Sequence, residues 1–171
     1  MHTIIKITVM VTDATLKYVK KGPSIVIHQE QEALDNMTDW AKEKHDGSGL
    51  ADASLKSQVP MKEAEFMVIN FIKTHVEKDE AQLAGNSVHT DIAFLRKYMP
   101  SLWHHLDYKV VDVTGVRELC WRWFPYAYKK RPKKVLRHTA LSDIEESMDE
   151  LRYYMTTIFR KSPAIPNRGY R

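Results

Sequence analysis

The feature that most constrains the fold is a run of β-branched and other apolar residues near the N-terminus, from Thr3 to Val11. β-Branched side chains pack well on a pleated surface, so this run predicts a buried strand. Two shorter apolar runs follow, at Leu16–Val19 and Ser24–His28, after an Asp13-Ala14 turn and a Gly22-Pro23 break. Short strands joined by tight turns predict an antiparallel meander.

Apolar residues at helical spacing replace this pattern in the rest of the chain. The expected elements are a helix within Gln29–His45 that ends at Gly47-Ser48-Gly49, a helix opened by Pro60, a strand at Gln82–Gly85, a helix at Val88–Tyr98, a strand at Tyr108–Val113, a helix at Thr114–Trp123 and a helix at Thr139–Arg160. Strands that alternate with helices after a meander predict an α/β fold, with one mixed sheet flanked by helices. No long linker divides residues 1–161, and Ser162–Arg171 is expected to be a flexible C-terminal tail.

Composition narrows the class of protein. At 171 residues and 43% hydrophobic content, the chain is expected to form one globular domain. Its single cysteine, Cys120, cannot form an internal disulfide, which favours a reducing compartment, and its apolar neighbours predict a buried small hydrophobe. No run is long enough to span a bilayer and no targeting signal is visible, so a cytoplasmic or mitochondrial protein without a membrane is expected. The net charge of +4 favours an anionic partner only slightly.

Asp91 is the first candidate for a functional role. Ligand sites in α/β folds gather at the carboxyl ends of strands. The turn at Gly85-Asn86-Ser87 holds such a position, and Asp91 lies one turn into the helix that follows. Its carboxylate can face a ligand held over the strand end, or it can compensate the helix macrodipole, and its position alone leaves both interpretations open.

His138 and Asp143 form a second candidate, just before and about one turn into the last helix. Phosphodiester cleavage by a metal-bound water uses a base, commonly His, and carboxylates that hold divalent cations. However, His75 also has an acid five residues on, at Glu80, so this spacing does not decide the matter.

The residues before His138 form a basic segment, Lys129–Arg137, with six positive charges. It is either a phosphate-attracting rim or a solvated loop, and the sequence does not separate these interpretations. Trp40 can stack a base or pack in the core. Trp121 and Trp123 are expected to pack. The sequence contains no P-loop, zinc-type Cys/His set or Gly-x-Ser-x-Gly elbow.

Short stretches in a fixed order extend along almost the whole chain. They are Ile4-Ile5, Val11-Thr12-Asp13, Gly22-Pro23, Asp39-Trp40, Ser48-Gly49-Leu50, Ala84-Gly85-Asn86-Ser87-Val88-His89 with Asp91, Phe94-Leu95, Lys97-Tyr98-Met99-Pro100, Val111-Asp112-Val113, Glu118-Leu119-Cys120 with Arg122-Trp123, and His138 with Ala140-Leu141, Asp143-Ile144 and Glu146-Ser147. Over roughly Ile4–Lys161, this series resembles the eukaryotic branch of the oligoribonucleases, a family of DEDD-type 3′–5′ exonucleases. The order and length of the match make it specific.

The resemblance implies a ribonuclease-H-like sheet and a homodimer that degrades short single-stranded RNA from its 3′ end to mononucleotides. Family members use two divalent ions, Mg²⁺ or Mn²⁺, held by four acids, with a His as general base. Matched by position, Asp91 resembles the third acid, Asp143 the last acid and His138 the base.

The resemblance also implies five substrate-binding positions. Trp40 falls where the family has an aromatic side chain near the terminal base. His45 and Ser87 fall where polar residues line the pocket. Tyr108 falls where a tyrosine reaches into the partner subunit's site, and Lys109 lies in the segment that resembles the phosphate-capping loop.

The sequence departs from the family pattern in two ways. The family begins with a strand ending in Asp-x-Glu, followed by Met-Thr-Gly-Leu, and this sequence starts after that motif. The first central strand, two of the four acids and the Leu that separates substrate bases therefore have no counterpart in it. In addition, Lys6 stands where the family usually has an acid, Asp107 replaces a His, Lys109 an Arg, and Ser142 an Asp.

These departures predict impaired catalysis. Two divalent ions roughly 3.5–4 Å apart repel each other, and anionic ligands must offset that repulsion. Asp91 and Asp143 supply only two negative charges, so weak binding of the ions and slow turnover are expected. The alternative is a non-catalytic paralogue that binds short RNA or pairs with a full-length subunit.

Overall fold

The computed structural model describes residues 2–133 and 140–159, and at residues 40, 44 and 46 it describes the backbone alone. The strands are β1 (Lys6–Thr12), β2 (Val19–Val26), β3 (Gln82–Gly85) and β4 (Asp107–Asp112). The helices are α1 (Gln31–Asp35), α2 (Asp39–Gly47), α3 (Leu50–Lys56), α4 (Met61–Lys73), α5 (Val88–Tyr98), α6 (Pro100–Trp103), α7 (Val113–Trp123), α8 (Pro125–Lys130) and α9 (Ala140–Thr157).

The N-terminal strands form a hairpin of two strands, where the sequence predicted a meander of three. β1 pairs antiparallel with β2, from Lys6 opposite Val26 to Thr12 opposite Val19. Gly22 and Pro23 do not break β2, because proline is tolerated in a strand that has a neighbour on one side only, as β2 has among the described residues. Gly22 instead allows close packing, since a Cβ there would lie 2.7 Å from Phe71 Cδ1 and 2.8 Å from Val9 Cγ2.

The turn of this hairpin is organised by Asp13. Its carboxylate accepts hydrogen bonds from the Thr15 hydroxyl at 2.7 Å and from the backbone N–H groups of Lys17 and Tyr18. The Thr15 hydroxyl and these amides lower the pKa of Asp13. The turn rests on α9, where the Arg152 guanidinium donates to the carbonyl of Leu16 at 3.2 Å.

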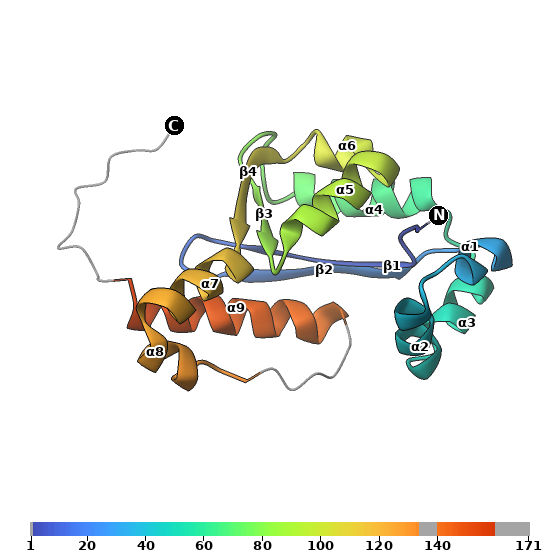
Figure 1. Cartoon of the computed structure of the whole chain (residues 1–171). Helices are drawn as coiled ribbons and strands as arrows, with labels where there is room; N and C mark the ends of the chain where they lie inside the picture. The colour runs from blue at the N-terminus through green and yellow to red at the C-terminus, as the bar shows by residue number, and fades with distance from the viewer. Residues whose placement is uncertain (1, 134–139, 160–171) are drawn as a thin grey trace.

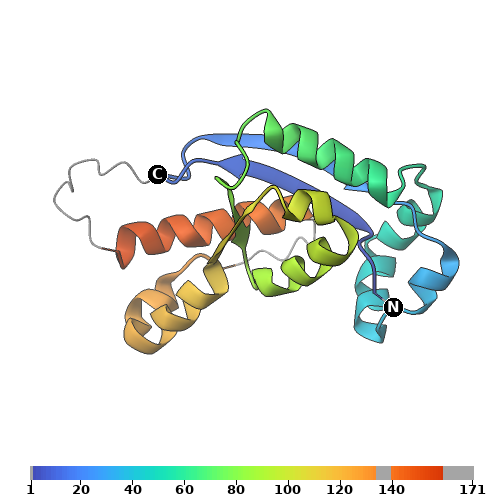
Figure 2. The same ribbon diagram turned by 90° about the horizontal axis from the view of Figure 1, so that it is seen from above.

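The second ladder pairs β3 parallel with β4, from Gln82 opposite Asp107 to Gly85 opposite Asp112. Among the described residues the two ladders are separate and do not join into one continuous sheet. α9 packs against both β1 and β3 and so connects the ladders, and α4 packs on the hairpin from the other side (Figures 1 and 2). The predicted α/β class is confirmed.

Two clusters of buried residues form the core. The larger one joins the hairpin to α4, α5 and α6 through Ile25, Ile27, Ala64, Val68, Ile72, Leu95, Met99 and Leu102. The smaller one, Val113, Cys120 and Tyr154, joins α7 to α9. Cys120 is 1% exposed, which confirms that it is a buried hydrophobe, and burial raises the pKa of its thiol.

Four helices, α4, α5, α7 and α9, start within one residue of their predicted positions. The helix expected within Gln29–His45 is instead divided into α1 and α2. Asn36 and Thr38 cause the break. The Asn36 side chain donates to the Glu32 carbonyl at 2.8 Å, and the Thr38 hydroxyl accepts from the Ala41 N–H at the start of α2. α3, α6 and α8 were not predicted, and α8 includes Lys129 and Lys130, which were assigned to a loop. No helix in the described part of the chain is long and apolar enough to cross a membrane.

Replacing Gly22 with alanine should destabilise the fold by about 1–3 kcal/mol, because the new methyl group has to displace the Phe71 ring or Val9. Chemical unfolding measures this difference. Gly115→Ala is the matched control, since a Cβ at Gly115 meets nothing within 4 Å and alanine favours the helix. Equal stability of the two variants would contradict the packing assigned to Gly22.

Candidate functional site

The candidate site lies at the carboxyl end of the β3–β4 ladder. Gly85 and Asp112 are register partners at this end, and each strand leads almost at once into a helix. α5 begins at Val88 and α7 at Val113, so the first turns of two helices lie at one edge of the ladder. This position agrees with the one expected from the Gly85-Asn86-Ser87 turn.

Asp112 joins the two strand ends. Its Oδ1 accepts the backbone N–H of Ser87 at 3.0 Å and that of Thr114 at 2.9 Å, and it forms the N-cap of α7. Ser87 has a φ of 55°, in the left-handed region that a residue with a side chain rarely adopts. The hydrogen bond that the Ser87 N–H donates to Asp112 supports this conformation, and the Ser87 and Thr114 hydroxyls lie 3.2 Å apart.

Asn86 extends the network to α9. Its side-chain oxygen accepts from the Thr114 hydroxyl at 3.4 Å, and its side-chain NH₂ donates to the hydroxyl of Ser147. Ser147 is 8% exposed, and its hydroxyl in turn donates to the backbone carbonyl of Asp143 at 2.6 Å. A continuous set of hydrogen bonds therefore connects the start of α5 with the first turns of α9.

Asp91 lies in the first turn of α5 at an exposed position. Desolvation by the surrounding protein raises the pKa of its carboxyl, and the nearby Asp112 carboxylate adds to the rise, while its own backbone N–H and His89 oppose it. Two neighbouring carboxylates make this strand end electronegative, which favours a cation there.

Asp143 lies in the first turn of α9, also exposed. The structure therefore connects Asp91 and Asp143, through their helices, to one hydrogen-bond network. His138 lies outside the described residues, as does the whole part of the basic segment that follows Lys133.

Of the residues predicted to bind substrate, Ser87 lies at the candidate site, between the end of β3 and the start of α5. Trp40 and His45 lie on α2, which packs against α3 on the side of the molecule where α9 begins (Figure 1). The Trp40 side chain is not among those described, and His45 is half-buried.

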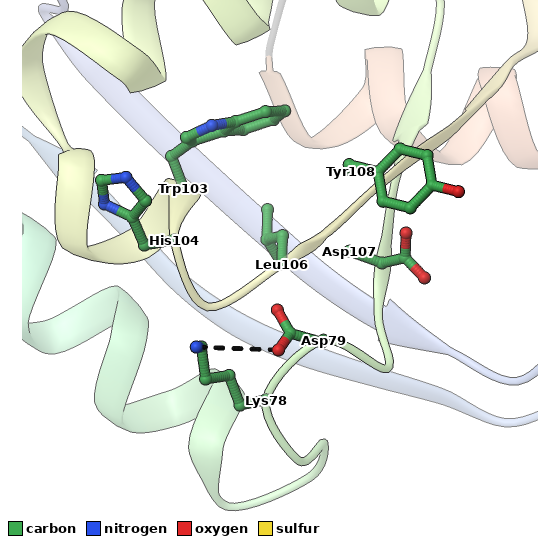
Figure 3. A pocket seen from close by; sticks show the side chains of 7 residues that line it. All are labelled: Lys78, Asp79, Trp103, His104, Leu106, Asp107 and Tyr108. Atoms are coloured by element: carbon green, nitrogen blue, oxygen red, sulfur yellow. Dashed lines mark ion pairs between the residues drawn. The ribbon is translucent and has the colours of Figure 1, made fainter. Parts of the chain in front are cut away.

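Tyr108 and Lys109 lie at the opposite end of β4 from Asp112. A strand rises ~3.3 Å per residue, which places them roughly 10–15 Å along the ladder from the candidate site. Tyr108 borders a hollow of about 390 Å³, which has Trp103 and His104 on one side and Asp107 and Tyr108 on the other (Figure 3). Tyr108 is 80% exposed.

Asp107 engages Lys109 directly. Its carboxylate accepts the Lys109 backbone N–H at 2.8 Å and lies 3.7 Å from the Lys109 ammonium. The Lys109 amide, followed by the Gln82 side chain and the Lys109 charge, lowers the pKa of Asp107. The positive charge of Lys109 is thus partly compensated within its own chain.

The prediction that Trp121 and Trp123 pack in the core is wrong. They are 53% and 65% exposed, because α7 turns Val116 and Cys120 toward α9 and places Leu119 and Trp123 on another face. β4 also exposes apolar side chains, at Val110 and Val111, which point to opposite faces of the strand. Tyr108, which shares a face of β4 with Val110, is exposed as well. We call the following exposed apolar side chains of β4 and α7 the β4–α7 residues: Tyr108, Val110, Val111, Leu119 and Trp123.

The chemistry of the donors at the candidate site fits a hard divalent cation. Asp91 and Asp143 offer carboxylate oxygens, the ligands that Mg²⁺ and Mn²⁺ prefer. Within residues 2–133 and 140–159, no group of three or more His, Cys, Asp or Glu side chains forms a ready metal cluster. Of the residues in this network, the sequence predicted a role only for Ser87. Asp112 stands just before α7, but its role as the helix cap was not predicted, and the pairing of Asn86 with Ser147, 61 residues apart, carried no local signal.

Comparison with known proteins defines the class. The RNase_T exonuclease family model matches residues 1–151, most of the chain.

The relatives are more specific. Human mitochondrial oligoribonuclease is 44% identical over 158 residues, covering 92% of this chain and 67% of the relative. A probable oligoribonuclease of Dictyostelium discoideum is 44% identical over 157 residues, covering 92% of this chain and 82% of the relative. The oligoribonuclease of Corynebacterium glutamicum is 43% identical over 163 residues, which cover 95% of this chain and 74% of the relative. The chain therefore belongs to the oligoribonuclease family of exonucleases.

Replacing Asp112 with asparagine should lower the pKa of Asp91, because it removes the neighbouring negative charge that helps to raise it. Asparagine retains an oxygen that can accept the Ser87 and Thr114 amides, so the network is expected to persist. Carboxyl-carbon NMR titration of Asp91 measures the shift, with Asp79→Asn as the control, because Asp79 lies in the turn before β3, beyond the other end of the ladder. An unchanged or higher pKa would show that the two carboxyls do not interact.

Proposed function

We propose that this protein is a 3′–5′ exoribonuclease that degrades short oligoribonucleotides to mononucleotides. The observation that carries the proposal is the joining of the Asp91 and Asp143 helices at one strand end by a hydrogen-bond network, in a chain 44% identical to oligoribonucleases. The family membership supports the reaction class, and the shared hydrogen-bond network supports Asp91 and Asp143 as the residues that would perform it.

Asp91 and Asp143 are the proposed ligands of the divalent ions, Mg²⁺ or Mn²⁺. When bound, such ions neutralise phosphate charge and lower the pKa of a coordinated water. The N-terminal N–H groups of α5 and the Ser87 hydroxyl offer hydrogen bonds to a phosphate at the same edge. His138 is the proposed general base, and Trp40 and His45 on α2 are proposed to contact the terminal nucleotide.

We further infer that the active form is a homodimer. Tyr108 and Lys109 lie at the far end of β4 from the candidate acids, so they are poorly placed to serve the site of their own chain. The β4–α7 residues, among them Tyr108, are apolar and exposed, as expected of side chains that a second copy covers. In a symmetric dimer, Tyr108 would complete the site of the partner. The compartment, cytoplasmic or mitochondrial, stays a prediction.

One observation favours the alternative function, a non-catalytic homologue that binds short RNA or pairs with a full-length subunit. The Asp107 carboxylate holds Lys109 through its amide and its ammonium group, so less of the lysine charge is available to a phosphate. Slow turnover, expected from the number of acids in the sequence, likewise stays a prediction.

A labelled RNA dinucleotide incubated with Mn²⁺ tests the proposal. We expect slow hydrolysis to mononucleotides, which Asp143→Asn lowers by more than about tenfold, the loss that outer-shell metal partners already cause. Asp149→Asn is the matched control, because Asp149 is an exposed acid on the same helix that pairs with Arg152. Binding of the dinucleotide without turnover would instead favour the non-catalytic homologue.

Mixing two variants tests the shared site. Tyr108→Ala should leave the acids of its own chain intact, and Asp143→Asn should leave Tyr108 intact. If Tyr108 acts in the partner's site, each variant alone is impaired, and a mixture regains activity because a mixed dimer contains one complete site. The chain that carries both substitutions, mixed with wild type, is the control. No recovery in a mixture shown to exchange subunits would contradict action across the dimer.

A further inference from the structure

The two candidate metal ligands come from helices that are distant in sequence. Asp91 belongs to α5 and Asp143 to α9, and neither carboxylate has a fixed position relative to the other unless the helices are tied together. Metal sites tolerate displacements of only about 0.5 Å in their ligands. Whatever holds the start of α5 against the start of α9 therefore determines whether the acids can share ions.

The hydrogen bond between Asn86 and Ser147 joins these two starts. Asn86 immediately precedes Ser87, the N-cap of α5, and Ser147 lies one turn after Asp143 on α9. The Ser147 hydroxyl accepts from the Asn86 side-chain NH₂ and donates to the Asp143 carbonyl, so both of its roles are used within the network.

The orientation of the Asn86 side chain is fixed from its other end. Its oxygen accepts from the Thr114 hydroxyl, and the backbone N–H of Thr114 binds Asp112. With the oxygen directed to α7, the NH₂ group is directed to α9. The Asn86 side chain therefore spans the ends of both β strands and the helix that carries Asp143.

We propose that Asn86 and Ser147 are positioning residues that set the separation of Asp91 and Asp143 and thereby the affinity for divalent cations. This inference rests on the proposed function of the two acids. Neither positioning residue supplies a carboxylate. Their effect on the ions passes through the backbone of Ser87 at one end and of Asp143 at the other.

A double-mutant cycle on the full chain tests the pair, with Mn²⁺ alone as the probe. Asn86→Ala and Ser147→Ala should each lower the Mn²⁺ affinity about tenfold, as loss of an outer-shell partner does. The double variant should lose much less than the product of the single losses, because both substitutions remove one hydrogen bond. Free Mn²⁺ is measured by electron paramagnetic resonance well below the unfolding temperature of every variant.

Ser54→Ala is the matched control. Ser54 is also buried, on α3, and its hydroxyl donates to the Ile27 carbonyl at 2.6 Å, so it has no part in the hydrogen bonds that join α5 to α9. It should lower stability without changing Mn²⁺ affinity. Equal losses of affinity in Ser54→Ala and Ser147→Ala would reduce the pair to a general structural role and overturn the inference.

The remaining outcomes separate the inference from the proposed function. The positioning role is wrong if Asn86→Ala binds Mn²⁺ as tightly as wild type does. It is also wrong if the affinity of the double variant falls by the product of the two single losses. In both cases the proposed function of the acids stands. If wild type and Asp143→Asn both leave Mn²⁺ free, the metal site itself is wrong, and the positioning role is overturned with it.

Discussion

The carboxylate of Asp112 accepts the backbone N–H groups of Ser87 and Thr114, and through them it joins the ends of β3 and β4. The other features of the candidate site depend on this interaction. It supports the left-handed conformation of Ser87, the residue at which the chain turns from β3 into α5, and it caps α7. A half-buried carboxylate that accepts two amides stabilises the helix start more than a neutral cap does, because hydrogen bonds to a charged acceptor are stronger.

α9 connects the two halves of the molecule. Its Arg152 donates to the turn of the β1–β2 hairpin, and its Ser147 binds Asn86 at the end of β3. A single rigid helix therefore relates the hairpin to the parallel ladder, which share no strand pairing among the described residues. The same helix places Asp143 one turn from this contact. Folding of the core and assembly of the candidate site are thus linked through one element.

Local patterns predicted the parts of the fold that depend on local physics. The strand at Gln82–Gly85, the helix at Val88–Tyr98 and the position of Asp91 in its first turn follow from turn residues and from helical spacing. The break at Asn36–Thr38 and the continuous β2 through Gly22-Pro23 did not, because both depend on contacts made by particular side chains. The exposure of Trp121 and Trp123 was missed for a related reason: α7 has more apolar positions than one face of a helix can bury.

The amino-acid order by itself determined the α/β class, the strand–turn–helix that carries Asp91, and membership of the oligoribonuclease family, since these depend on periodicity and on motifs in a fixed order. Only the tertiary structure decided that Asn86 meets Ser147, that Asp112 serves two amides, and that Tyr108 and Lys109 lie at the other end of β4 from the acids. The physical reason is that hydrogen bonds between residues 25 to 61 positions apart form only after the helices and strands have packed, and no local pattern encodes that packing.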